Sequence, residues 1–187
     1  KENNNSDLLI RLFNEVLEKY PNFKEYIPFI NEEILEKVYL ETNIEVEKNT
    51  TVLQAARKAN IDIPTLCFLK EISANGDCRM CVVEIEGRRG LSPSCITIVE
   101  DGMVIKTNTP KINEARRVIL DLILSSHNRT CLTCVRNGNC ELQTLAEKFG
   151  ITDIEYPGVE VEPHIDDLSP SIVRDASKCI MCKRCVA

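Results

Sequence analysis

The chain has no apolar segment long enough to cross a membrane. A membrane-spanning helix needs about 20 consecutive apolar residues, and the longest apolar run here, residues 118–124, is interrupted by Asp121. The N-terminus also lacks the basic and apolar regions of a signal peptide. We therefore predict a protein with no transmembrane segment that stays in the cytoplasm.

Clustered positive charge is absent as well. The formal net charge is -6, and the basic residues are scattered apart from short pairs such as Arg88-Arg89 and Arg116-Arg117. Proteins that bind nucleic acid gather lysine and arginine on one face. The sequence therefore predicts no nucleic-acid partner.

Cysteine is what the chain has in excess, with ten among 187 residues. In a small secreted chain an even number of cysteines would indicate disulfides. Here most of them fall in Cys-x2-Cys groups, which close a loop poorly but hold a metal well. Without a signal peptide, this spacing predicts metal-binding thiols in a reducing compartment.

The densest set of candidate ligands lies in residues 127–140. The spacing is His-x3-Cys-x2-Cys-x5-Cys, so one imidazole and three thiols occur within fourteen residues. Judged by ligand type alone, this set suits zinc or an iron-sulfur cluster. Its members are His127, Cys131, Cys134 and Cys140.

Two further sets of cysteines flank this stretch. The earlier set has the spacing Cys-x10-Cys-x2-Cys-x13-Cys, and the later one reads Cys-x2-Cys-x2-Cys. The later set matches the first three ligands of a bacterial ferredoxin run, whose fourth cysteine follows three residues on. That position would lie beyond Ala187, so we expect a piece of a longer polypeptide. The two sets are Cys67, Cys78, Cys81 and Cys95, and Cys179, Cys182 and Cys185.

Periodicity and end signals predict an α+β chain. Two strands followed by a short helix, as in residues 38–60, are typical of the start of a β-grasp domain. Residues 151–171 are rich in Pro, Asp, Glu and Ser, which predicts an irregular linker with His164 as an ordinary surface residue. Helices are predicted over 6–20, 31–35, 50–60, 110–126 and 141–149, a strand over 82–86, and hairpins over 38–41 with 44–47 and 96–99 with 103–106.

The cysteine sets and their surroundings resemble one family. Residues 51–67, T-V-L-Q-A-A-R-K-A-N-I-D-I-P-T-L-C, resemble the [2Fe-2S] domain that opens [FeFe]-hydrogenases and the large iron-sulfur subunit of complex I. The long first gap departs from plant-type ferredoxins, as it does in that group. Residues 171–187, S-I-V-R-D-A-S-K-C-I-M-C-K-R-C-V-A, resemble the NAD(P)-linked or electron-bifurcating hydrogenases. The resemblance covers residues 37–187.

Periodicity predicts a helical segment at 1–36. For the rest of the chain the resemblance implies three consecutive parts: a β-grasp [2Fe-2S] ferredoxin-like domain at 37–109, a small helical [4Fe-4S] domain at 110–150, and a linker with a truncated bacterial-type ferredoxin motif at 151–187. It also implies the ligands of each cluster. They are Cys67, Cys78, Cys81 and Cys95 for [2Fe-2S]; His127, Cys131, Cys134 and Cys140 for [4Fe-4S]; and Cys179, Cys182 and Cys185 for an incomplete [4Fe-4S] site.

Zinc is the simpler explanation of any four-ligand set of cysteine and histidine, and three zinc sites would be an alternative. The first quartet, however, has long gaps inside a predicted β-grasp pattern, unlike the paired halves of a zinc ribbon. The last trio has no fourth ligand nearby. Iron-sulfur clusters account for all ten cysteines, and we favour them.

The expected function is therefore electron relay within an iron-sulfur oxidoreductase. In hydrogenases of this type the catalytic centre lies further along the chain, so we expect no catalytic residue here. The expected partners are flavin- or NAD(P)H-dehydrogenase subunits, or ferredoxin, within a multisubunit complex. Alternatives are the corresponding segment of a complex I-like subunit or NAD(P)-linked formate dehydrogenase, and a zinc-binding docking module that contacts its partner through residues 1–36.

Overall fold

A computed structural model describes residues 42–159 and 164–186. By their contacts the residues divide into two compact units, Lys1–Asn43 and Ile44–Ala187, and the described helices and strands belong to the second. The helices predicted over 6–20 and 31–35, and the strand over 38–41, lie outside the described residues. Within the described ranges, no helix is long and apolar enough to cross a membrane.

The first described element is helix α3, Val52–Lys58, as predicted. Its N-terminus is closed by a capping box, in which the Thr51 hydroxyl accepts a hydrogen bond from the Gln54 N–H and the Gln54 side chain accepts one from the Thr51 N–H. This reciprocal pair satisfies two N–H groups that have no partner within the helix. The inward face carries Val52, Leu53, Ala55 and Ala56.

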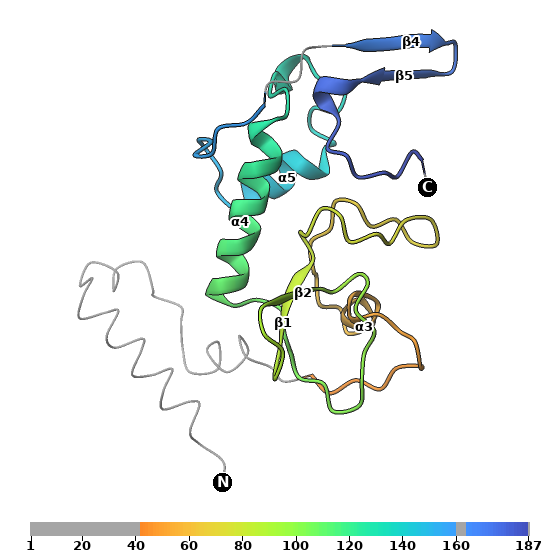
Figure 1. Cartoon of the computed structure of the whole chain (residues 1–187), viewed down its shortest axis with the longest axis vertical. Helices are drawn as coiled ribbons and strands as arrows, with labels where there is room; N and C mark the ends of the chain where they lie inside the picture. The colour runs from red at the N-terminus through yellow and green to blue at the C-terminus, as the bar shows by residue number, and fades with distance from the viewer. Residues whose placement is uncertain (1–41, 160–163, 187) are drawn as a thin grey trace, which may run out of the picture. The chain divides into compact units, whose positions relative to one another are not determined.

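A three-stranded antiparallel sheet packs with α3 (Figure 1). Its central strand is β1, Val82–Ile85, between β2, Leu91–Pro93, and β3, Ile105–Lys106. The register pairs Val83 with Ser92 and Ile85 with Ile105. The first hydrophobic core lies between helix and sheet and consists of Val52, Leu53, Ala56, Ile63, Phe68, Cys81, Val83, Ile85 and Cys95.

The hairpin predicted over 96–99 and 103–106 is wrong. The turn at 101–102 forms, but β3 pairs with the edge of β1. Residues 97–99 instead hydrogen-bond to the start of α3, where the Val52 N–H donates to the Thr97 carbonyl at 2.8 Å and the Val99 N–H donates to the Thr50 carbonyl at 3.0 Å. The strand predicted over 44–47 is also absent, since this segment has no ladder partner among the described residues.

Helix α4, Pro110–Ser125, begins where the Thr109 side chain accepts a hydrogen bond from the Ile112 N–H. The Thr109 hydroxyl also donates to Glu84 of β1 at 2.6 Å, which fixes the helix start to the sheet. Helix α5, Glu141–Lys148, follows as predicted. The two helices form a second core with the loops that precede β1. Its buried residues are Leu66, Met80, Leu120, Leu142 and Leu145.

The C-terminal part contains a hairpin where we predicted an irregular linker. Strand β4, Ile165–Ser169, pairs antiparallel with β5, Ile172–Asp175 (Figure 1). The linker prediction holds for residues 151–159 but is wrong for 165–169, because those residues have a partner strand two residues further on. His164 is exposed, as expected.

The second core yields a matched pair of test positions on α4. Leu120 is fully buried, whereas Leu122 is 50% exposed. We expect Leu120→Ala to destabilise the fold by about 2–5 kcal/mol, since it leaves a cavity, and Leu122→Ala to change stability by less than about 0.5 kcal/mol. Thermal unfolding of the loaded protein, followed by circular dichroism, measures the difference. Equal melting temperatures for the two variants would contradict the assigned burial.

Candidate iron-sulfur centres

The first quartet of cysteines lies inside the first domain. Cys67 follows the loop after α3, Cys78 and Cys81 lie in the loop before β1, and Cys95 follows β2. Cys67, Cys81 and Cys95 are at most 1% exposed, and Cys78 is half-buried. Segments distant in sequence thus bring their thiols into the interior.

The four thiols are arranged as two pairs. The Cys67 N–H donates to the Cys78 sulfur at 3.4 Å. A hydrogen bond from the Cys95 thiol lowers the pKa of Cys81 to about 6, and the same bond raises the pKa of Cys95. Burial raises the pKa of Cys78.

This donor set fits a [2Fe-2S] cluster. Such clusters are held by four thiolates, two on each iron, and the 67/78 and 81/95 pairs match that division. Metal ligation requires the thiolate form. The hydrogen bond between Cys81 and Cys95 favours that form at Cys81 and disfavours it at Cys95.

A buried cation lies beside this quartet. Arg116 of α4 is 3% exposed, and it donates from Nε to the Met80 carbonyl at 3.2 Å and from a terminal nitrogen to the Val82 carbonyl at 2.8 Å. The sequence patterns did not single out this residue. One sequence signal could have indicated its burial. Arg116 lies four residues after Ile112 and four before Leu120, so it falls on the same helix face as these two apolar residues.

His127 lies just past the C-terminal end of α4. Its N–H donates to the Leu124 carbonyl at 3.2 Å, and its side chain is half-buried. Burial lowers the pKa of its imidazole, and Lys178 lowers it further, while Asp175 raises it. Its Nδ1 is buried and has no hydrogen-bond partner among the described residues. A neutral imidazole with an unused nitrogen fits a metal ligand.

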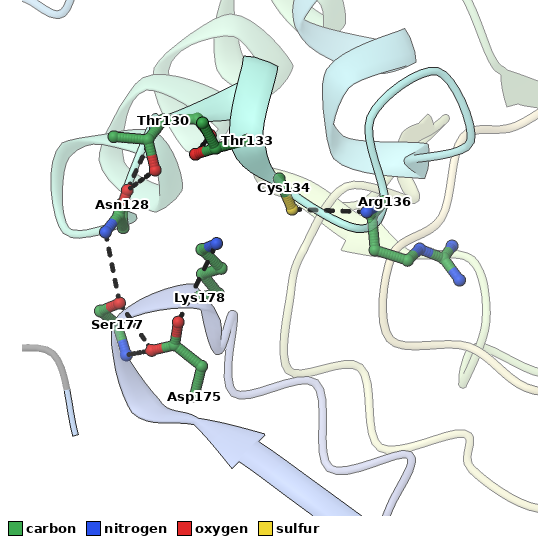
Figure 2. Close-up of polar contacts among 8 residues, drawn as sticks. All are labelled: Asn128, Thr130, Thr133, Cys134, Arg136, Asp175, Ser177 and Lys178. Carbon is green, nitrogen blue, oxygen red and sulfur yellow. Dashed lines mark hydrogen bonds and ion pairs between the residues drawn. The ribbon is translucent and has the colours of Figure 1, made fainter. Parts of the chain in front are cut away.

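The loop after His127 forms a 3-10 turn, η2, Cys131–Thr133. The Asn128 side chain accepts hydrogen bonds from the N–H and the hydroxyl of Thr130, and the Arg136 N–H donates to the Cys134 sulfur at 3.5 Å (Figure 2). An N–H directed at a sulfur stabilises added negative charge there. Of the three thiols, Cys131 is exposed, while Cys134 and Cys140 are half-buried.

The last cysteine set begins after η3, Ala176–Lys178. The Met181 N–H donates to the Cys179 sulfur at 3.4 Å. The Asn128 N–H donates to the Ser177 carbonyl at 2.8 Å, and their side chains also meet (Figure 2). The loop that follows His127 is therefore fixed directly to the segment that precedes Cys179.

Arg184 connects all three sets. One terminal nitrogen donates to Glu141 at 2.9 Å, and the other donates to the Phe68 carbonyl at 3.1 Å. Glu141 directly follows Cys140, and Phe68 directly follows Cys67. Arg184 itself lies between Cys182 and Cys185, so one guanidinium holds the three cysteine-bearing segments together.

The described part of the chain has no three His, Cys, Asp or Glu side chains gathered closely enough to hold a single metal ion.

Comparison with protein families identifies two regions. Residues 41–110 match the 2Fe-2S iron-sulfur cluster binding domain, and residues 116–155 match the NADH-ubiquinone oxidoreductase-G iron-sulfur binding region. The chain contains a [2Fe-2S] domain followed by a [4Fe-4S] region. The two cofactors expected from the sequence are thus confirmed, and the zinc alternative is not supported for these regions.

Relatives with this [2Fe-2S] domain and [4Fe-4S] region are oxidoreductases. The chain is 52% identical over 145 residues to the NADP-reducing hydrogenase subunit HndD of Solidesulfovibrio fructosivorans, covering 75% of this chain and 25% of that protein. It is 43% identical over 148 residues to an NADH-quinone oxidoreductase subunit of Rhizobium meliloti (strain 1021), covering 78% and 17%. It is 39% identical over 145 residues to iron hydrogenase 1 of Clostridium pasteurianum, covering 75% and 25%.

The fold has a counterpart among solved structures. A chain of an NAD+-reducing [NiFe]-hydrogenase in the H2-reduced state superposes with a TM-score of 0.72 at 33% identity, covering 78% of this chain and 61% of that one. The curated relatives are much longer, and this chain spans a quarter or less of the three named above. The chain is therefore homologous to the iron-sulfur segment of hydrogenases and complex I-like subunits.

The contrast in exposure predicts the order in which the clusters are lost to oxygen. The [2Fe-2S] domain buries three of its four cysteines, whereas Cys131 in the [4Fe-4S] region is exposed. During controlled air exposure we expect the [4Fe-4S] signal to decay severalfold faster than the [2Fe-2S] signal, because solvent reaches it more easily. Electron paramagnetic resonance (EPR) of reduced aliquots measures both, and prior loss of [2Fe-2S] would contradict the prediction.

Proposed function

We propose that this segment relays single electrons between a redox partner and a catalytic centre elsewhere in a longer oxidoreductase. The observation that carries the proposal is the contact among the three cysteine-bearing segments, made by Arg184 through Glu141 and Phe68. Electron transfer between clusters requires them to lie close together in a rigid frame. Ion pairing of Lys183 with Asp77 at 3.2 Å adds a second link between the last segment and the first quartet.

We assign the ligands as the sequence predicts. A β-grasp [2Fe-2S] domain at 37–109 and a small helical [4Fe-4S] domain at 110–150 hold one cluster each, and residues 151–187 contribute the start of a bacterial-type ferredoxin domain. The proposed sets are Cys67, Cys78, Cys81 and Cys95; His127, Cys131, Cys134 and Cys140; and, for a further [4Fe-4S] cluster, Cys179, Cys182 and Cys185.

When bound, each cluster supplies a site that accepts one electron with little movement of its ligands. The chain sets how readily that happens through ligand charge, hydrogen bonds to sulfur and burial. The N–H groups of Met181, Arg136 and Cys67 each point at a cysteine sulfur and so favour the more negative, reduced state. His127 replaces a thiolate with a neutral ligand, which acts in the same direction.

For the parent enzyme we propose an NAD(P)-linked hydrogenase, because HndD of Solidesulfovibrio fructosivorans is 52% identical over the shared segment. Its partners would then be flavin- or NAD(P)H-dehydrogenase subunits, or ferredoxin, in a cytoplasmic multisubunit complex. A complex I-like iron-sulfur subunit is the second candidate, favoured by the 43% identity to the Rhizobium meliloti protein. No residue of this segment is assigned a catalytic role.

Metal analysis tests the cluster assignment. Anaerobically purified protein should contain sulfide and roughly six irons per chain, or about ten if the last cysteine set is completed by another ligand. Cys95→Ser should remove the [2Fe-2S] EPR signal and leave [4Fe-4S] in place, because Cys95 belongs only to the first quartet. Zinc without sulfide would refute the relay.

His127 offers a second, independent test. His127→Cys should retain the [4Fe-4S] cluster and make it harder to reduce, because a thiolate adds a negative charge where the imidazole was neutral. His127→Ala should lower the cluster content. His164→Ala is the matched control, since that histidine is exposed and distant in sequence from any cysteine. A redox titration that gives the wild-type potential for His127→Cys would remove His127 from the ligand set.

A further inference from the structure

Arg116 is an unusual residue to find in the interior of this protein. Its side chain is 3% exposed, and among the described residues no carboxylate lies within ion-pair distance of it. Burying an unpaired charge is costly. A guanidinium cannot relieve that cost by losing its proton, because arginine stays protonated in proteins. A compensating negative group is therefore required nearby.

The hydrogen bonds of Arg116 show where that group lies. The guanidinium donates to the carbonyls of Met80 and Val82 at 3.2 Å and 2.8 Å, which are the residues on either side of Cys81. The positive charge is thus held against the backbone that carries one of the buried thiols. Met80 is itself fully buried, so little solvent lies between the cation and this loop.

The charges around Arg116 point to the same thiol. Burial lowers the pKa of the guanidinium, while Cys81 and Asp62 raise it. Asp62 is a poor compensating group, since its side chain is 81% exposed and pairs with Lys148 at 3.1 Å. Cys81 is 1% exposed. The buried negative charge available to Arg116 is therefore on the quartet of thiolates.

We propose that Arg116 is a positioning residue for the [2Fe-2S] site, which fixes the Met80–Val82 backbone around Cys81 and raises the reduction potential through its buried positive charge. This inference rests on the proposed assignment of Cys81 as a cluster ligand. Reduction turns one ferric iron into ferrous iron with an electron from the donor. No bond forms or breaks, and Arg116 keeps its proton. Arg116 stabilises the negative charge that reduction would add to the cluster.

The sequence offers a matched control next to this residue. Arg117 is exposed and is placed in neither the cluster site nor the core. Arg116→Lys keeps the positive charge but loses the forked donor geometry, Arg116→Gln keeps a donor without charge, and Arg116→Met keeps much of the volume with neither. Together the variants separate charge from packing and hydrogen bonding.

The test is an EPR-monitored redox titration of the full chain, loaded and purified anaerobically, with the [4Fe-4S] signal as an internal reference. We expect Arg116→Gln and Arg116→Met to reduce the equilibrium constant for one-electron reduction of [2Fe-2S] about tenfold, which corresponds to a potential about 59 mV more negative. Arg116→Lys should stay close to wild type, and Arg117→Gln should not shift either signal.

Wild-type potentials in Arg116→Gln and Arg116→Met would overturn the inference, and so would an equal shift in Arg116→Lys, since geometry alone would then explain it. If Arg116→Gln and Arg116→Met fail to retain the cluster, Arg116→Lys decides between the two roles. An Arg116→Lys variant that retains the cluster at the wild-type potential supports the role of charge. An Arg116→Lys variant that also loses the cluster shows that Arg116 is structural only. Absence of a [2Fe-2S] signal from the wild-type chain would refute the ligand assignment itself.

Discussion

The first hydrophobic core is built partly from thiols, and the rest of the domain follows from that constraint. Cys81 and Cys95 belong to the same buried cluster as Leu53, Val83 and Ile85. Positions that aliphatic side chains would normally fill are given to groups that carry negative charge when they bind iron. The sheet is accordingly short, with strands of two to four residues, and the intervening loops carry the cysteines inward.

Buried negative charge requires compensation, and the chain provides it through cations and backbone N–H groups placed beside the sulfurs. Arg116 reaches the first quartet from α4, and Arg184 reaches it from the C-terminal segment through the Phe68 carbonyl. In the sequence, Arg116 precedes the ligand set that begins at His127, and Arg184 follows it. The residues that compensate charge therefore also hold the cysteine-bearing segments together.

Much of this architecture was predictable because its signals are local. The Thr51 cap of α3, the proline at the start of α4, the Gly150 that follows the end of α5 and the spacing of the three cysteine sets all lie within a few residues of the features they determine. The errors concern pairing: the strand at 105–106 uses β1 as its partner, and residues 165–169 form a hairpin despite a loop-like composition. Strand partners are set by the tertiary fold, which local composition does not encode.

The charged residues of α4 show a second limit of local patterns. The apolar positions predict that Val118 and Leu122 face inward, yet Leu122 is half-exposed while Arg116 and Asp121 are buried. Asp121 accepts hydrogen bonds from the N–H groups of Glu155 and Tyr156 at 3.0 and 3.3 Å. The groups that satisfy a buried charge of this kind are distant from it in the sequence. Hydrophobic periodicity alone therefore places such a charged residue on the solvent-exposed face of the helix.

The cysteine loops also contain strain that glycine content does not reveal. Arg79, Met181 and Lys183 adopt positive φ values of 58, 53 and 60°, a conformation that costs a non-glycine residue about 1–2 kcal/mol. All three lie between cysteines of a Cys-x2-Cys pair. Such conformations persist only where the surroundings impose them, and here the Met181 N–H is directed at the Cys179 sulfur. The turn that places Met181 in this conformation also directs its N–H group at the Cys179 sulfur, so the strained backbone and the hydrogen bond to a proposed ligand belong to the same local structure.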